Sequence, residues 1–341
     1  MLELLESIDS FLAKGQKFAQ ATVIKTWGSA PRPVGSIMLV CEDGTMSGSV
    51  SGGCVEGAIV KQAQEVLKTT QPKLLNFGIS DDEAWSVGLS CGGSIQVFLE
   101  PFIAFTDAET WKILRGLLQE NKGCVLATQL NETTHNALLI IPNDEIIGKN
   151  KQENIKTPSL KAYNERNTML FETETGKKWF LNTMPPKHKL IIIGAAHITV
   201  DLVHLAHYFG FETIVIDPRG IFASKTDFPT PPNVLHIDWP IEILPDYTLD
   251  AYTYSVLLTH DPKIDDQALH ILLKSEIAYI GCLGSKKTHE KRMKRLTEVG
   301  FTESEIGKIH APIGIDIHAK SAREIALSII SELIKSKNAY L

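Results

Sequence analysis

The chain has few of the features that mark secreted, membrane-bound or metal-cluster proteins. Its 341 residues include five scattered cysteines and no Cys-x-x-Cys pair, which argues against a disulfide framework and a structural zinc site. Residues 1–9 are acidic and amphipathic and lack the basic and apolar regions of a signal peptide. No apolar run approaches the length that crosses a bilayer. We therefore expect a reduced, cytoplasmic protein with no membrane partner.

Positive charge is also in short supply. There are 34 Lys and Arg residues against 40 Asp and Glu, for a formal net charge of -6, so composition gives no reason to expect a nucleic-acid partner. One basic run, residues 286–295, is interpreted as the solvated face of a helix rather than as a phosphate patch. The length predicts two or three domains, and Pro185 and Pro186 mark a boundary between residues 1–184 and 188–341.

Glycine, in contrast, is concentrated in two loops that each contain a cysteine. Residues 45–57 read T-M-S-G-S-V-S-G-G-C-V-E-G, and residues 88–93 read G-L-S-C-G-G. Glycine accumulates where the backbone turns sharply or approaches a ligand, and a cysteine thiolate is a soft ligand. The plainer alternative is two tight turns with buried cysteines. The binding residues predicted here are Ser51, Gly52, Gly53, Cys54, Cys91, Gly92 and Gly93.

An arginine in a rigid loop precedes the first of these segments. Arg32 lies between Pro31 and Pro33 in a stretch, residues 27–35, that two prolines and two glycines keep out of regular structure. Its guanidinium is presented with little backbone freedom, which suits capture of a phosphate or carboxylate. An exposed surface arginine is the alternative. Pro31, Arg32 and Gly35 join the predicted binding residues.

The N-terminal domain is predicted to be α+β and internally duplicated. Residues 121–128 resemble residues 14–22, and residues 137–144 resemble residues 37–44. Each pair consists of a strand and the turn beside it. In this interpretation the glycine-cysteine loops are kept only in the first half.

The C-terminal domain has the pattern of a Rossmann-like parallel sheet. Residues 189–193 form a continuous apolar strand, Gly194 begins a turn into a helix, and a second strand ends at Asp217. The dinucleotide fingerprint is incomplete because Ala196 and Thr199 stand where glycines are expected. The predicted fold class is α/β, and binding of NAD(P) or another nucleotide stays open.

The strand ends of such a sheet are where ligands bind. The binding residues predicted there are Gly194, Ala195, Ala196, His197, Asp217, Arg219, His260, Asp261, Gly281, Gly284 and Ser285. His197, Asp201 and His204 could hold a metal ion, but a solvent-facing helix surface is the preferred interpretation of these three residues.

These motifs together resemble the XdhC/CoxI family of xanthine dehydrogenase maturation factors. Their order and spacing are specific, although each one is short. The matching segments are residues 28–35, 51–56, 88–93, 194–198, 217–219, 259–261, 279–285 and 311–315. One departure is His318, where the family commonly has glycine.

The resemblance implies a chaperone that binds molybdenum cofactor, protects it from oxidation and delivers it to a xanthine dehydrogenase-type hydroxylase after sulfuration. Arg32 and the loop N–H groups would hold the anionic pterin phosphate, and Cys54 or Cys91 would contact molybdenum. A cysteine desulfurase is the implied sulfur donor. A homodimer is the default assembly.

Three other functions remain open. An NAD(P)-linked oxidoreductase would use His197 or His260 as its acid or base. A sulfur- or selenium-mobilising factor would carry the chalcogen on Cys54 or Cys91. Xanthine dehydrogenase itself is disfavoured, because no cysteine cluster in the sequence could hold an iron–sulfur group.

Overall fold

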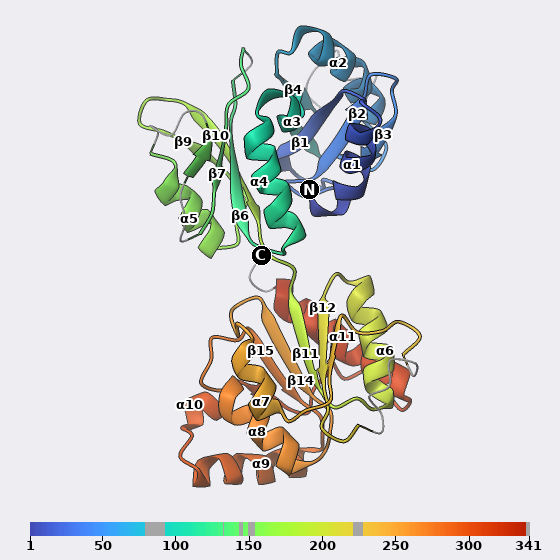
Figure 1. Ribbon diagram of the computed structural model, residues 1–341, viewed down its shortest axis with the longest axis vertical. Helices are drawn as coiled ribbons and strands as arrows, with labels where there is room; N and C mark the ends of the chain where they lie inside the picture. Colours follow the sequence, from blue (N-terminus) through green and yellow to red (C-terminus); the bar gives the residue numbers. More distant parts are fainter. Residues whose placement is uncertain (79–92, 132, 143–145, 149–153, 221–227, 339–341) are drawn as a thin grey trace. The chain divides into compact units, whose positions relative to one another are not determined.

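The computed structural model divides the chain into two compact units, Met1–Pro186 and Lys187–Leu341 (Figure 1). It describes residues 1–78, 93–131, 133–142, 146–148, 154–220 and 228–338. Among these residues, no helix combines the length and apolarity needed to span a membrane.

The first unit is built from one pattern of elements used twice. Its first half contains α1 (Leu5–Ala13), β1 (Phe18–Trp27), β2 (Ile37–Cys41), β3 (Met46–Gly48), α2 (Glu56–Thr69), β4 (Lys73–Phe77) and β5 (Ser94–Pro101). After the short α3 (Ile103–Thr106), the second half contains α4 (Ala108–Gln119), β6 (Cys124–Gln129), β7 (Ala137–Ile140), β8 (Ile146–Gly148), α5 (Lys156–Asn164), β9 (Met169–Glu172) and β10 (Lys178–Met184). The strand β1 runs on to Trp27, which the sequence pattern predicts to be part of a loop.

Each half forms an antiparallel five-stranded sheet with the same strand order. The orders are β3-β2-β1-β5-β4 and β8-β7-β6-β10-β9, so every strand of the first sheet has a counterpart in the second. The pairing register repeats as well, because Leu74 lies opposite Phe98 in the first sheet and Leu170 lies opposite Phe180 in the second. This is the arrangement that an internal duplication predicts.

The two sheets pack together through their inner faces. One shared apolar cluster joins Phe18 and Leu39 to Leu126 and to Trp111 of α4, and a smaller one joins Ile24, Phe98 and Phe180. Between them on β1, β5, β6 and β10 lies a belt of buried polar side chains: Gln20, Thr22, Glu100, Thr128 and Asn182. The outer faces are covered by α2 and α5.

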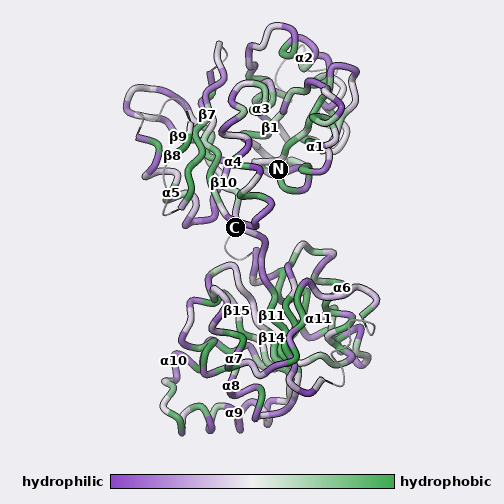
Figure 2. The backbone as a smooth tube through the Cα atoms, viewed as in Figure 1, coloured by the Kyte–Doolittle hydropathy of each residue, from purple (hydrophilic) through white to green (hydrophobic). Residues whose placement is uncertain are grey.

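The second unit is a parallel sheet with helices on both faces, which confirms the predicted Rossmann-like fold. Its strands are ordered β13-β12-β11-β14-β15-β16, and in Figure 2 the buried strands β11 and β14 are strongly hydrophobic. The strands are β11 (Lys189–Ile193), β12 (Glu212–Ile216), β13 (Val234–His236), β14 (Thr253–Leu257), β15 (Tyr279–Cys282) and β16 (Ile309–His310). The helices are α6 (His197–Tyr208), α7 (Pro240–Ile243), α8 (Pro262–Leu272), α9 (Lys286–Glu298), α10 (Glu303–Ile306) and α11 (Ala322–Asn338).

The helices divide between the two faces of this sheet. Apolar residues of α6 and α11 pack on one face, and those of α8 and α9 pack on the other. The strand order reverses between β11 and β14, so the loops after these two strands lie at the switch point where such sheets bind ligands. A Cβ atom on Gly194 would lie 2.9 Å from Thr259 Cγ2, which shows how closely the two loops approach.

Gly48 and its counterpart Gly148 have a backbone conformation that both repeats share. Its φ is +83°, and an added Cβ would lie 2.3 Å from the Ile37 carbonyl oxygen. Gly148 is restricted in the same way, by the Ala137 carbonyl oxygen at 2.7 Å. We expect Gly48→Ala to lower the free energy of unfolding by more than about 1 kcal/mol, measured by urea denaturation.

Gly116 provides the matched control for this measurement. It lies inside α4, and no atom comes within 4 Å of an added Cβ. Gly116→Ala should therefore leave stability unchanged or raise it by up to about 1 kcal/mol. Equal effects of the two substitutions would contradict the proposed backbone constraint.

Candidate functional site

Three of the motif-bearing segments meet at one end of the first sheet. A Cβ atom on Gly52 would lie 3.7 Å from Pro31 Cβ, so the loop after β3 touches the loop after β1. Gly93, just before β5, lies against the same loop, because its Cβ would be 2.5 Å from the Ser29 carbonyl oxygen. Cys54 and Ala30 pack on one apolar cluster. Gly92 and Cys91 are outside the described residues.

The loop after β3 is organised by Glu56, the first residue of α2. Its carboxylate is 7% exposed and accepts backbone hydrogen bonds from Ser51 at 2.9 Å, Gly52 at 3.1 Å and Gly53 at 2.9 Å. The hydroxyls of Ser49 and Ser51 also donate to it. Glu56 belongs to one of the family motifs, but no sequence pattern predicts that its side chain organises the loop.

The same hydrogen bonds keep Glu56 ionised. Burial by itself would raise the pKa of its carboxyl group, but the hydrogen bonds from Ser51 and Ser49 outweigh this effect and lower the pKa to about 2. The loop N–H groups that were predicted to hold an anionic ligand therefore already donate hydrogen bonds to the carboxylate of Glu56. What this loop can offer to a ligand is side-chain chemistry.

Cys54 and Arg32 supply that chemistry. Cys54 precedes the N-cap of α2 and is partly exposed. The Nε atom of Arg32 is buried, and among the described residues it has no hydrogen-bond partner. An orphaned guanidinium N–H fits an anionic group, and an accessible thiol fits a soft metal or a sulfur atom.

The other described thiols do not offer this chemistry. Cys41, Cys124 and Cys282 are fully buried. Burial raises the pKa of Cys41 to about 11 and the pKa of Cys124 and of Cys282 to about 12. Among the cysteines that the structure describes, Cys54 is the one placed to react or to bind a metal.

The glycine turn of the second unit also binds a carboxylate of the chain. Asp217 is 1% exposed, and its Oδ2 atom accepts hydrogen bonds from the Ala195 N–H and from Arg219 Nη2, both at 2.7 Å. Its Oδ1 atom accepts a third from Arg219 Nε at 2.9 Å. Burial opposes ionisation, but the bonds from Arg219 and Ala195 lower the pKa of Asp217. Asp217, which the sequence predicts as a binding residue at the end of a strand, thus holds the turn at Gly194.

The loops after β14 and β15 are linked by buried polar groups. The Thr259 hydroxyl donates to Asp265 Oδ1 at 2.6 Å, and Asp265 Oδ2 lies 3.6 Å from Arg292 Nη2. Arg292, itself 2% exposed, donates to the Leu283 carbonyl at 3.3 Å. Burial raises the pKa of Asp265 despite these partners. This network fixes the two strand ends relative to each other.

Several strand-end residues predicted as ligand contacts have structural roles here. The Asp261 carboxylate caps α8 by accepting a backbone N–H bond of 2.9 Å, and Ser285 caps α9. Gly281 allows Ile313 to pack closely on the backbone, because a Cβ atom added at Gly281 would lie 2.3 Å from Ile313 Cδ1. His260 is exposed, with a left-handed φ of +60°.

The three residues of α6 that were considered as metal ligands, His197, Asp201 and His204, do not form a metal site. Asp201 Oδ1 lies 3.6 Å from Arg323 Nε, and His204 Nδ1 lies 2.8 Å from the Thr230 hydroxyl. Within the described ranges no three His, Cys, Asp or Glu side chains are grouped so that they could hold a metal ion.

Two models of one family match parts of both units. Residues 11–78 match the model described as "XdhC and CoxI family", and residues 190–333 match the XdhC Rossmann domain. The chain belongs to the XdhC/CoxI family, as its motifs indicated.

Individual relatives cover nearly the whole chain. A protein of Bacillus subtilis named as a probable subunit of xanthine dehydrogenase is 26% identical over 97% of this chain and 96% of its own length. "Molybdenum cofactor insertion chaperone PaoD" of Escherichia coli is 26% identical over 94% of this chain and 84% of its own. A crystal structure from Bacillus halodurans, described as a xanthine dehydrogenase, aligns with a TM-score of 0.77 at 28% identity, over 98% of this chain and 96% of that one.

The role of Glu56 can be tested through pH. Its folded-state pKa of about 2 lies below its ordinary value of 4.5, so its contribution to stability is present above pH 4.5 and is lost as pH falls toward 2. Glu56→Gln should cost on the order of 3 kcal/mol at pH 7, and the difference from the native chain should shrink by roughly half at pH 3. Urea unfolding at pH 7 and at pH 3 measures this difference in the free energy of unfolding.

Glu109→Gln serves as the control, because Glu109 is an exposed glutamate in the first turn of α4. It should change stability by less than about 0.5 kcal/mol at either pH. A pH-independent difference between Glu56→Gln and the native chain would contradict the ionised state assigned to Glu56.

Proposed function

We propose that this chain binds molybdenum cofactor and delivers it to a xanthine dehydrogenase-type molybdenum hydroxylase, assisting the sulfuration of the cofactor before transfer. The observation that carries the proposal is the meeting of the Arg32 loop with the Cys54 loop at one end of the first sheet. The names of the relatives support the same partner class and the same cargo.

The residues at this end of the sheet fit such a cargo. When bound, the cofactor would bring an anionic pterin phosphate and a molybdenum atom held by two sulfurs. Arg32 would neutralise the phosphate through its orphaned Nε–H. The Cys54 sulfur would contact the metal or its exchangeable sulfur. Cys91, in the neighbouring motif, is the second thiol proposed for this contact.

Glu56 would act as a positioning residue for Cys54. It fixes the backbone from Ser51 to Gly53 through three N–H bonds, and Val55 N–H donates to it at 3.2 Å. The thiol therefore occupies a set position before any ligand arrives, which lowers the entropic cost of binding.

The remaining parts of the proposal concern assembly and sulfur supply. Sulfuration needs a sulfur donor, and a cysteine desulfurase would provide it as a persulfide. A homodimer in the cytoplasm is the proposed working form, because two-fold pairs are the commonest assembly of soluble proteins. NAD(P) is not part of the proposal, since the Asp217 carboxylate already binds Ala195 and Arg219.

The proposal is tested by anaerobic co-purification of the chain from a host that makes molybdenum cofactor, with metal analysis and pterin fluorescence. We expect Cys54→Ser to reduce bound molybdenum about tenfold. This factor corresponds to the loss of about 1.4 kcal/mol of binding free energy. Arg32→Ala should weaken retention by a similar factor through loss of a charge-assisted hydrogen bond.

Cys41→Ala is the matched control, because the Cys41 thiol is fully buried in the same unit. It should retain molybdenum at the native level. Unchanged retention in both Cys54→Ser and the double variant Cys54→Ser/Cys91→Ser would remove the thiols from the function. A persulfide or selenide adduct on Cys54 in the intact mass, without bound pterin, would instead favour sulfur or selenium mobilisation.

A further inference from the structure

The strand β1 carries an exposed tryptophan to the end of the first sheet where the glycine-cysteine segments meet. Trp27 is the last residue of β1, and its side chain is 49% exposed. Its carbonyl oxygen lies 2.8 Å from the position of a Cβ atom added at Gly93, the last residue of the second glycine-cysteine motif. Trp27 therefore borders the candidate site, although no motif predicts it as a binding residue.

A β-bulge turns the Trp27 side chain to the inner face of the sheet. The pairing of β1 with β5 shifts after Val23, and beyond the shift Trp27 lies opposite Ser94. Ser94 is four residues before Phe98 of the smaller shared apolar cluster, so both side chains point to the inner face. Directly paired residues share a face. Without the bulge Trp27 would point, as Val23 does, to the outer face that α2 covers.

The end of β1 that carries this tryptophan has no counterpart in the strand β6 of the second repeat. Ala21 and Ala127 hold corresponding positions, because they pair with corresponding residues of β2 and β7. The strand β6 ends at Gln129, the counterpart of Val23, so residues 24–27 extend β1 beyond its copy. The repeat with the glycine-cysteine motifs is thus also the one with the longer strand.

Small residues lie beside Trp27 on the inner face. Its direct neighbour on β5 is Ser94, and Gly78 follows the end of β4 beyond it. A Cβ atom added at Gly78 would lie 2.6 Å from Ser94 Cβ, so these two residues are side by side. Together they form what we call the Trp27 step, a large flat indole next to nearly bare backbone. A flat ring laid on the indole would meet few side-chain atoms there.

The neighbouring row of the same face is polar. Lys25 lies opposite Gln96, and Gln96 lies opposite Asn76. Lys25 Nζ is 4.3 Å from the centroid of the Trp27 ring, so the ammonium group occupies one face of the indole. Gln96 Nε2 donates to Asn76 Oδ1 at 2.8 Å. This bond leaves Gln96 Oε1 as an acceptor and Asn76 Nδ2 as a donor for the polar edge of a ring.

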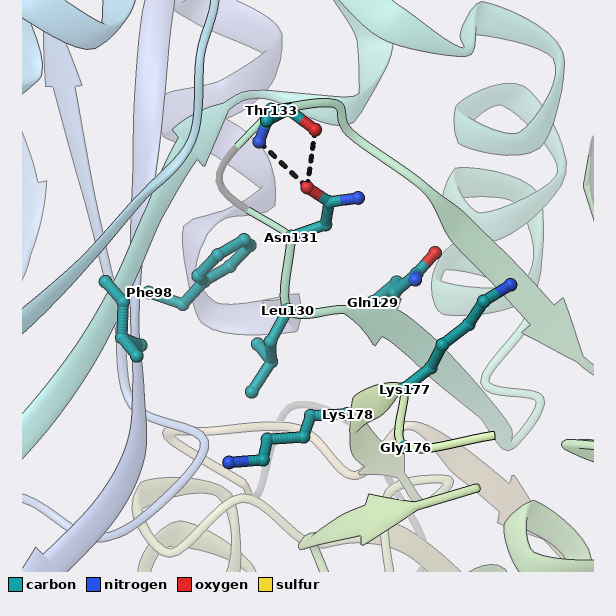
Figure 3. A pocket seen from close by; sticks show the side chains of 9 residues that line it. Phe98, Gln129, Leu130, Asn131, Thr133, Gly176, Lys177 and Lys178 are labelled. Carbon is teal, nitrogen blue, oxygen red and sulfur yellow. Dashed lines mark hydrogen bonds between the residues drawn. The ribbon is translucent and has the colours of Figure 1, made fainter. Parts of the chain in front are cut away.

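Beyond this polar row the second repeat covers the inner face. Phe98, two residues after Gln96, is 2% exposed, and Leu130 of the second repeat packs on its cluster (Figure 3). Val34, from the loop that contains Arg32, packs on the same cluster. The partly exposed area therefore lies between this cluster and the end of the sheet, and the loop of Arg32 borders it.

We propose that the Trp27 step binds the flat ring of a pterin, with the ring stacked on the indole and its polar edge at the amides of Gln96 and Asn76. The inference rests on the proposed function, because molybdenum cofactor would supply the pterin. It assigns the ring to a side chain outside the predicted binding residues, and it requires neither Cys54 nor a metal ion.

The test uses neopterin monophosphate, a fluorescent and metal-free pterin with a phosphorylated side chain. It is titrated into the full chain and followed by fluorescence anisotropy. We expect saturable binding at one site per chain. Trp27→Ala should weaken binding about tenfold through loss of the stacking surface. Trp27→Phe keeps a flat ring and should stay within about threefold of the native affinity.

Trp239→Ala is the matched control, because Trp239 is a 39% exposed tryptophan of the second unit. It should bind neopterin monophosphate as the native chain does. Cys54→Ser should also bind it at the native level, because this pterin carries neither metal nor dithiolene. Thermal unfolding of each variant establishes that it is folded.

Three results would overturn the inference: no saturable binding of neopterin monophosphate to the native chain, native-level binding by folded Trp27→Ala, or equal weakening in Trp27→Ala and Trp27→Phe. Failure of the proposed function gives a different result. If the native chain retained no molybdenum cofactor but bound neopterin monophosphate through Trp27, delivery would be contradicted and the Trp27 step would stand.

Discussion

The first unit depends on one buried charge, the carboxylate of Glu56. An ionised group removed from water is tolerated only when its oxygen lone pairs are satisfied. The chain meets this requirement by wrapping the loop after β3 around Glu56, with backbone donors at Ser51, Gly52 and Gly53. The start of α2 and the position of Cys54 both follow from this wrapping. Glycine is needed there because Gly52 and Gly53 have φ values of +79° and +124°.

The second unit uses the same device at Asp217, whose carboxylate binds the turn at Gly194 through the Ala195 N–H. Glycine turns at helix N-termini are commonly taken as phosphate sites, because their N–H groups point at an anion. In this chain the anion is a carboxylate of the protein in both turns, Glu56 in the first unit and Asp217 in the second. In the proposed function, ligand recognition in the first unit therefore falls to side chains, namely the half-buried Arg32 and the partly exposed thiol of Cys54.

The sequence predicted the parts of the fold that rest on local pattern. The alternation of strands and helices after Lys187 and the repeated strand-turn segments were both visible in it. It did not predict that Gly281 is needed for packing, since the partner, Ile313, is distant in sequence. The role of Glu56 was also missed, because an acid in the first turn of a helix has an ordinary explanation in the helix dipole. Only the folded loop shows which donors it receives.

Duplication accounts for how the first unit combines a rigid frame with two different sets of loops. Phe98 and Phe180 occupy matching positions in the two sheets, so the inner faces were kept while the connections diverged. The strand β5 begins just after Gly93, at the glycine-cysteine end, and carries Phe98 of the smaller shared apolar cluster. Five residues of extended chain span roughly 17 Å. Because β5 is paired on both sides, by β1 and β4, that separation is fixed by strand register and does not depend on either loop.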